Sequence, residues 1–185
     1  MQEDRVRWNK RYMKNNYSSE PSQIILDYFH LAKVGKALDI GAGTGRNSLF
    51  LSQQGFEVDS VDISELALER IEKNNPKIKT FHADLDDFEL EENSYELIIN
   101  INFLLRRLYK PIIKALKKDG ILIFQTFLDS PHLENTTRTV HKAFYLKSNE
   151  LLKAFGEFQI LFYEEKGILD PVPDQRNLAS LVALK

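Results

Sequence analysis

The hydrophobic pattern alternates between short apolar runs and amphipathic stretches from Lys36 to the end of the chain. The run Leu97-Ile98-Ile99 is apolar at consecutive positions, as in a central strand that is covered on both faces. Strands that alternate with helices are typical of βαβ units and predict a mostly parallel sheet. We expect a first strand from about Lys36 to the residue before Gly41, and further strands at 56–62, 79–82, 97–101, 121–127, 158–163 and 179–184.

Helices are predicted between these strands from the helical spacing of apolar residues. Ser64 is suited to cap a helix at 65–75, because its side chain can accept a hydrogen bond from the first turn. Gly55 is suited to end the preceding helix, since glycine readily adopts the left-handed conformation. The other helices are expected at 5–12, from about Pro21 to no further than Gly35, at 46–54, at 108–118 and at 148–155, with a polar stretch at 128–147.

A glycine-rich turn follows the first predicted strand directly, within the segment 38–48 (LDIGAGTGRNS). Its three glycines allow a sharp turn and let a ligand lie against bare backbone. The spacing differs from a dinucleotide fingerprint, which would need glycine where Arg46 stands, and no Lys-Ser/Thr follows as in a P-loop. We therefore expect a different cofactor, with Asp39 as an acidic residue beside the loop.

Asp62 closes the second predicted strand, in the segment 56–62 (FEVDSVD). In a doubly wound sheet, a carboxylate at this position can accept hydrogen bonds from both hydroxyls of a ribose. Asp62 could instead cap the next helix, but Ser64 is placed to do so. The ligand is therefore expected to carry a ribose.

At this point the chain resembles the class I S-adenosylmethionine-dependent methyltransferases. The resemblance rests on four segments that occur in the family's order: the glycine motif Leu38 to Gly45, Asp62 as the ribose acid, Ala83-Asp84-Leu85, and 116–122 (LKKDGIL). The last is similar to the family's L-K-P-G-G-x-L turn, with Lys118-Asp119 in place of Pro-Gly. The similarity extends from about Trp8 to Lys185, which is nearly the whole chain.

Further segments resemble a small bacterial branch that includes tellurite and thiopurine methyltransferases. These are Trp8-Asn9-Lys10-Arg11-Tyr12 and the segment 45–51 (GRNSLFL). Asn102-Phe103-Leu104 with Arg106 or Arg107, followed by Gln125-Thr126-Phe127, is similar to small methyltransferases that carry N-Y-L-x-R and E-T-F.

The resemblance implies a fold, a cofactor and a set of contacts. The implied fold is a Rossmann-like, doubly wound, seven-stranded, mostly parallel α/β sheet with an antiparallel C-terminal strand and helices on both faces. The implied cofactor is S-adenosyl-L-methionine, with S-adenosyl-L-homocysteine as its product. Its contacts are expected from an N-terminal lid, the glycine loop and the ends of the strands, at Trp8, Arg11, Tyr12, Asp39, Gly41, Ala42, Gly43, Gly45, Asp62, Ile63, Asp84, Leu85, Asn100 and Asn102.

The methyl acceptor is less well specified by the sequence. We expect a small molecule, with thiol and chalcogen compounds as candidates, contacted by Phe103, Arg106, Phe127 and Arg138. His132, His141 and Phe144 are further candidates in or beside the polar stretch. No motif identifies a general base, and a thiol that ionises near neutrality would not need one. The four histidines show no metal-site spacing, so no metal is expected.

Composition narrows these expectations. A chain of 185 residues with 43% hydrophobic content predicts one domain, with an N-terminal helical lid segment at 1–34 and a Rossmann-like core at 35–185. A net charge of −2 and a pI near 6.1 disfavour a nucleic-acid substrate, because they provide no overall positive field to attract a polyanion. Absence of cysteine, a charged N-terminus and no long apolar stretch favour a cytoplasmic protein, soluble and not membrane-bound. We expect a monomer or homodimer, although no residue of the sequence specifies which.

Three alternatives to this function stay open. The same cofactor could serve a nucleic-acid or protein acceptor, with Arg106, Arg107 and the lysines that follow as a phosphate-binding stripe. The chain could also bind the cofactor without catalysing transfer. A nucleotide-dependent oxidoreductase is a remote third alternative, which Arg46 disfavours.

Overall fold

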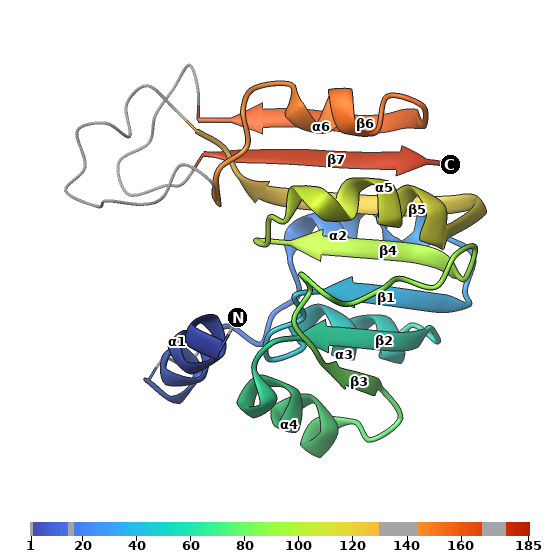
Figure 1. Cartoon of the computed structure of the whole chain (residues 1–185). Coiled ribbons are helices and arrows are strands. Elements are labelled where there is room, and N and C mark those ends of the chain that lie inside the picture. The colour runs from blue at the N-terminus through green and yellow to red at the C-terminus, as the bar shows by residue number, and fades with distance from the viewer. Residues whose placement is uncertain (1, 15–16, 130–143, 168–176) are drawn as a thin grey trace.

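The computed structural model describes residues 2–14, 17–129, 144–167 and 177–185. Seven strands form one sheet in the order β3-β2-β1-β4-β5-β7-β6 (Figure 1). Their bounds are β1 Lys36–Ile40, β2 Glu57–Asp62, β3 Lys79–His82, β4 Tyr95–Ile101, β5 Leu116–Phe127, β6 Gln159–Lys166 and β7 Leu178–Leu184. β7 runs in the opposite direction to the other strands of this sheet, because it pairs antiparallel with both β5 and β6. The mostly parallel sheet and its antiparallel C-terminal strand are confirmed.

Helices cover both faces of the sheet. The helices are α1 Gln2–Lys14, α2 Gln23–Tyr28, α3 Arg46–Gln53, α4 Glu65–Asn74, α5 Tyr109–Ala115 and α6 Glu150–Ala154, with 3₁₀ turns η1 Phe29–Leu31 and η2 Arg106–Leu108. Residues of α2, α3 and α4 join one buried cluster, and residues of α5 and α6 join the other. Each face of the sheet is therefore buried beneath its own helices, as expected for parallel strands with apolar runs.

Two helix boundaries show how well local signals worked. Ser64 caps α4 as expected, because its hydroxyl oxygen accepts a hydrogen bond from Ala67 N at 3.2 Å. The helix expected at 108–118 is wrong beyond Ala115, since Leu116 already pairs with Tyr95 at the start of β5. Lys117 follows within β5, and its Nζ donates to Glu96 Oε1 of β4 at 2.5 Å. Lys117 is therefore not part of a helix surface.

The carboxyl ends of β1, β2 and β4 lie at the same edge of the sheet, since these strands are parallel. We call this the carboxyl edge. Figure 1 shows the loops after these strands and helix α1 gathered there. Residues from segments far apart in the sequence are thus brought to one place, which is where open α/β sheets bind ligands.

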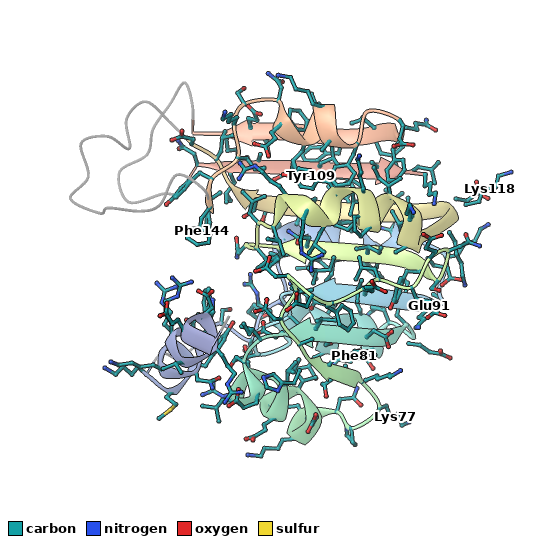
Figure 2. The ribbon with its side chains drawn as sticks, in the orientation of Figure 1. Lys77, Phe81, Glu91, Tyr109, Lys118 and Phe144 are labelled. Atoms are coloured by element: carbon teal, nitrogen blue, oxygen red, sulfur yellow. The ribbon has the colours of Figure 1, made fainter. Side chains whose placement is uncertain are left out.

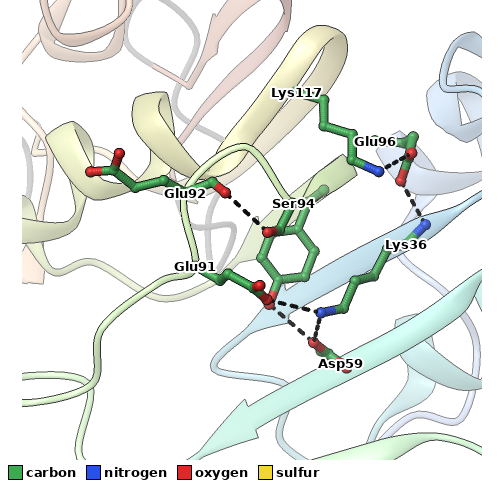
Figure 3. Close-up of polar contacts among 8 residues, drawn as sticks. Lys36, Asp59, Glu91, Glu92, Ser94, Glu96 and Lys117 are labelled. Atoms are coloured by element: carbon green, nitrogen blue, oxygen red, sulfur yellow. Dashed lines mark hydrogen bonds and ion pairs between the residues drawn. The ribbon is translucent and has the colours of Figure 1, made fainter.

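A polar cluster occupies the opposite edge, where β1, β2 and β4 begin (Figure 3). Asp59 is buried and accepts a hydrogen bond from the Tyr95 hydroxyl at 3.0 Å, while Lys36 Nζ lies 3.1 Å from the same oxygen. Glu96 accepts from Lys36 N at 2.7 Å. These contacts tie three strands together away from the carboxyl edge.

None of the helices in the described parts of the chain is long and apolar enough to cross a membrane.

Candidate functional site

The glycine loop connects β1 to α3 at the carboxyl edge. Gly41, Gly43 and Gly45 have positive φ angles of 67°, 56° and 80°, which L side chains rarely adopt. A Cβ atom on Gly41 would lie 3.0 Å from Phe103 Cγ, and one on Gly43 would lie 2.7 Å from the Tyr12 hydroxyl. The loop is therefore closely contacted by α1 and by the segment after β4, and only glycine is accommodated without a shift of these neighbours.

Asp62 lies against this loop at the end of β2. Its Oδ2 accepts a hydrogen bond from Gly43 N, and its Oδ1 accepts one from Ser64 N, both at 2.8 Å. Burial raises the pKa of this carboxyl group, and the hydrogen bonds from Ser64 and Gly43 oppose the rise. Each carboxylate oxygen has a further lone-pair site. Asp62 thus links the glycine loop to α4 and retains the capacity to accept hydroxyl groups.

Asp39 lies deeper, within β1, and is only 2% exposed. Its Oδ2 accepts a hydrogen bond from the Ser48 hydroxyl at 2.6 Å. Burial raises the pKa of Asp39 to about 6, against the lowering effect of the Ser48 hydrogen bond, and the nearby Asp62 raises it further. The site therefore contains two neighbouring buried carboxyl groups.

Neither buried carboxyl group has an ion-pair partner in the described part of the chain. Arg46 lowers the pKa of Asp39, but less than the Ser48 hydrogen bond does. His82 lowers the pKa of Asp62, but less than the hydrogen bonds from Ser64 and Gly43 do. The hydrogen bonds that stabilise the two groups come from neutral donors, namely serine hydroxyls and backbone N–H groups. A buried negative charge without a counterion favours a positively charged ligand.

Helix α1 places its aromatic face beside the glycine loop. Tyr12 is 8% exposed, and its ring lies 5.8 Å from that of Trp8. Burial and then the charge of Asp62 raise the Tyr12 pKa, so its hydroxyl remains protonated. Arg11 is exposed and lies over the Trp8 ring at 5.0 Å. Of the three predicted lid residues, Tyr12 thus makes the closest contact with the loop.

The end of β4 forms another wall beside the loop. Asn100 is 1% exposed, and its Nδ2 donates to Phe103 O at 2.7 Å. Asn102 has a positive φ of 58° and donates its N–H to Gln125 O at 2.8 Å. This turn directs the chain so that Phe103 packs against Gly41. Asn100 and Asn102 therefore have clear structural roles, and their expected cofactor contacts stay predictions.

The Asp84 segment is held close to Asp62 through the backbone. Ala83 N donates to Asp62 O at 3.1 Å, which places the turn after β3 beside the end of β2. Asp84 Oδ1 accepts from Asp86 N at 3.0 Å, and Leu85 is buried. Ile63 is half-buried, and its carbonyl oxygen contacts His82 Nε2 at 3.1 Å. The predicted adenine-side residues thus lie on neighbouring turns of the same edge.

Of the acceptor candidates that the structure describes, Arg106 contacts α6. The Arg106 guanidinium, expected to bind an acceptor, forms hydrogen bonds to Glu150 at 2.7 and 2.9 Å and to Tyr145 O at 2.8 Å. Phe127 lies 6.1 Å from the ring of Tyr145. Phe144 is exposed near α1, where Arg7 lies 5.9 Å from its ring (Figure 2). The remaining candidates Arg138, His132 and His141 lie outside the described residues.

Several residues that contribute to this edge escaped sequence reasoning. Ser48 and Ser60 are fully buried around Asp39, and Asn9 accepts a hydrogen bond from the Ser64 hydroxyl at 2.6 Å. Glu150 is the partner of Arg106. Serine on the buried face of a predicted helix is a usable signal, whereas the Asn9 and Glu150 contacts join segments distant in sequence. Within the described ranges, no group of three or more His, Asp or Glu residues could hold a metal ion.

The strand order, the antiparallel β7 and the glycine loop together define the class: the fold is that of the class I methyltransferases. It is similar to the crystal structure of TehB from Haemophilus influenzae, with a TM-score of 0.77 and 22% sequence identity over 96% of this chain and 67% of that chain. Residues 5–179 match the model of the family described as "Tellurite resistance protein TehB". The chain belongs to this family.

Relatives in sequence carry methyltransferase names. The chain is 29% identical over 149 residues to the Haemophilus influenzae protein named "Probable S-adenosyl-L-methionine-dependent methyltransferase TehB", a match that covers 76% of this chain and 52% of that protein. The chain therefore spans about half the length of this relative. A shorter match, 38% identical over 71 residues, covers 34% of this chain and 30% of a "tRNA1(Val) (adenine(37)-N6)-methyltransferase" from Flavobacterium psychrophilum.

Proposed function

We propose that this protein binds S-adenosyl-L-methionine at the carboxyl edge and transfers its methyl group to a small-molecule acceptor. The observation that carries the proposal is the Asp62 carboxylate, which accepts a hydrogen bond from Gly43 N in a loop where three positions have the positive φ angles that favour glycine. A ribose held there would lie against bare backbone with a carboxylate at its diol. Membership of the TehB family supports the same activity.

The chain's own residues would bind and align the reactants. The cofactor supplies a methyl group that is already electrophilic, so the protein needs to position the acceptor and exclude water. Such alignment can contribute on the order of 7 to 11 kcal/mol to lowering the barrier. Tyr12 and Phe103 contact the glycine loop from α1 and from the β4 end, and are the side chains placed to exclude water there. No described residue is assigned as a general base.

A small acceptor is favoured over nucleic acid by the pairing of basic residues around η2 and α5. Four of the six basic residues from Arg106 to Lys118 are paired: Arg106 with Glu150, Arg107 with Asp86, Lys114 with Glu92, and Lys117 with Glu96. A phosphate-binding stripe needs cations that are available to the backbone of the nucleic acid. We propose thiol and chalcogen compounds as acceptors, since the family description names tellurite and such acceptors need little help to ionise.

The relative that is named a tRNA methyltransferase favours one alternative, a nucleic-acid acceptor. RNA that shifts in electrophoresis with the protein, with an affinity that falls steeply as salt is raised, would support that alternative. The third candidate, a protein that binds the cofactor without transferring methyl groups, would show binding and no product with any acceptor.

A single-domain organisation, a cytoplasmic location and a monomer or homodimer remain our proposals.

The test combines binding and turnover. Purified protein should melt at a higher temperature with saturating S-adenosylmethionine, and should form S-adenosylhomocysteine with one of a panel of small thiols, selenite and tellurite. Asp62→Asn should lower cofactor affinity by about tenfold or more, because a ribose hydroxyl loses a charged acceptor. Ser94→Ala, at the opposite edge, is the control and should bind normally. Normal affinity in Asp62→Asn would contradict the proposal.

A further inference from the structure

Three buried polar side chains form a chain of hydrogen bonds beneath the glycine loop. The Ser60 hydroxyl donates to Ser48 Oγ at 2.8 Å, and the Ser48 hydroxyl donates to Asp39 Oδ2 at 2.6 Å. Ser48 and Ser60 are 0% exposed, and Asp39 is 2% exposed. The three residues come from α3, β2 and β1, and Asp39 and Ser60 are directly paired across the two strands. We call them the Asp39–Ser48–Ser60 relay.

The direction of these hydrogen bonds is set by the number of protons available. A serine hydroxyl has one proton to donate and two lone pairs that accept. Because Ser60 donates to Ser48, the oxygen of Ser48 is satisfied as an acceptor and its own proton is free to point at Asp39. Ser60 therefore supports the Ser48 hydrogen bond although it does not touch Asp39 itself.

We propose that the Asp39–Ser48–Ser60 relay holds Asp39 as the anion that attracts a positively charged part of the cofactor, so that Ser48 and Ser60 are positioning residues of the cofactor site. This inference rests on the proposed function, because it assumes that S-adenosylmethionine binds at the glycine loop. Neither serine needs to contact the cofactor. Their effect is on the charge and orientation of Asp39.

The charged and titratable groups around Asp39 make the relay necessary. Asp62 on β2 disfavours a second negative charge nearby, and Arg46 at the start of α3 favours it. Tyr12 on α1 stays neutral, and the β4 residue paired with Asp39 is the apolar Ile99. Burial is the largest effect and works against the anion, whereas the Ser48 hydrogen bond is the largest effect that favours it. Removal of the Ser48 hydroxyl should therefore protonate Asp39 at a higher pH.

The experiment measures cofactor affinity by calorimetry from pH 5.5 to pH 8. In the wild-type protein, affinity for S-adenosylmethionine should fall as the pH drops through about 6, where Asp39 gains its proton. In Ser48→Ala the midpoint of this fall should move upward by about one pH unit, since a hydrogen bond to a charged group is lost. Ser60→Ala should show a smaller shift in the same direction. Ser52→Ala, one turn further along α3, is the matched control and should keep the wild-type midpoint.

Three ligands separate a charge effect from a structural one. S-adenosylmethionine and S-adenosylhomocysteine carry a positively charged amino group, whereas 5′-methylthioadenosine carries no positive charge near neutral pH. The pH-dependent fall should appear for the first two and be absent for the third. An equal fall for 5′-methylthioadenosine, or an unchanged midpoint in both Ser48→Ala and Ser60→Ala, would overturn the relay's role.

Protein folding is checked by thermal melting of each variant. If Ser48→Ala does not fold, the smaller shift in Ser60→Ala decides the question, and its absence overturns the inference. Failure of the proposed function has a different signature, because wild-type protein would then bind none of the three ligands at any pH.

Discussion

At the scale of residues, Asp39 and Asp62 are the most consequential side chains of the carboxyl edge. Asp39 is 2% exposed and Asp62 is 6% exposed, and both are stabilised by neutral donors. A buried carboxylate costs stability unless hydrogen bonds and charges compensate for its loss of hydration. A positively charged ligand that binds nearby would stabilise these two carboxylates. Without the ligand, their buried charge lowers the stability of the protein.

Asp39→Asn should therefore stabilise the unliganded protein while it weakens cofactor binding. The pKa of Asp39 is raised from 3.8 to about 6 on folding, so the folded state binds the proton more tightly than the unfolded state. Above pH 6 the Asp39 carboxyl group is charged in the folded state, and its buried charge lowers the free energy of unfolding by the full amount. This loss of stability disappears as the pH falls toward 3.8, because folded Asp39 then becomes neutral. At pH 7 the substitution should raise the free energy of unfolding by up to about 3 kcal/mol.

Urea denaturation of wild type and Asp39→Asn at pH 7 and at pH 4.5 measures this penalty. The stability difference between the two proteins should be smaller at pH 4.5, where more of the wild-type carboxyl group is neutral. Calorimetry at pH 7 should show weaker binding of S-adenosylmethionine to the variant. An Asp39→Asn protein that is less stable than wild type at pH 7 would refute this account of the residue.

At the scale of elements, α1 is docked on α4 through a few polar contacts. The Ser64 hydroxyl donates to Asn9 Oδ1 at 2.6 Å, and Arg70 donates to Tyr12 O at 2.7 Å. Ser64 N also donates to Asp62. The Asn9 contact thus joins the proposed lid, through Ser64, to Asp62, the proposed ribose-binding residue.

Asn9→Ala should speed the release of bound cofactor about fivefold, because one hydrogen bond that holds α1 is lost. Stopped-flow displacement of bound S-adenosylhomocysteine measures the rate of release. Lys10→Ala, at the exposed neighbouring position of α1, should release the cofactor at the wild-type rate. Equal rates of release in Asn9→Ala and wild type would show that this contact does not hold α1 over the bound cofactor.

The ion pair between Arg106 and Glu150 connects η2 to α6. Glu150 also accepts from the Tyr109 hydroxyl at 2.8 Å and from Lys147 N at 2.9 Å. Burial alone would raise the Glu150 pKa, but the hydrogen bonds from Arg106, Lys147 and Tyr109 lower it below its ordinary value. Because the folded pKa is lowered, the stability that this group contributes is present near neutral pH and is lost as the pH falls through its folded pKa.

A double-mutant cycle of Arg106→Ala and Glu150→Ala should give a coupling energy of about 1 kcal/mol at pH 7, since the pair is bidentate but partly exposed. The coupling should decrease in acid. Affinity for S-adenosylmethionine should stay within about twofold of wild type in all three variants, because the contacts of this pair are with Tyr145, Tyr109 and Lys147 and not with the glycine loop. A large loss of cofactor affinity would place Arg106 in the cofactor site instead.

Sequence reasoning located the elements well where signals were local. The seven strands and the Ser64 cap follow from apolar runs and from one capping side chain. The end of the helix before β5 was missed because Lys117 resembles a helix surface in sequence, whereas its partner Glu96 is on another strand. Such a pairing between distant segments leaves no trace in the hydrophobic pattern.

At the scale of the whole molecule, the two edges of the sheet have different roles. The carboxyl edge brings together glycines with positive φ angles and buried carboxyl groups, whereas the opposite edge is held together by contacts of Lys36, Asp59 and Tyr95 (Figure 3). Stability contributed at the second edge can compensate for the cost of the buried carboxyl groups at the first. The division of one domain into a lid at 1–34 and a core at 35–185 remains a prediction.

The candidate site was predictable to the extent that it lies on the ends of parallel strands. Gly43, Asp62 and Tyr12 come together in the structure as the glycine motif and its resemblance suggested. The relay around Asp39 and the pairing of Arg106 with Glu150 depend on which side chains face each other after folding. The sequence alone does not show that Arg106 pairs with Glu150, and a contact between Arg106 and an acceptor stays a prediction.

The central claim is that S-adenosyl cofactor binds between the glycine loop and Asp62. A crystal structure of the protein with S-adenosylhomocysteine tests it most directly. We predict ribose hydroxyls within hydrogen-bond distance of the Asp62 carboxylate and ligand atoms packed against the backbone of Gly41 and Gly43. Electron density for the ligand at any other place, with the Asp62 carboxylate bound only to Gly43 and Ser64, would contradict the account.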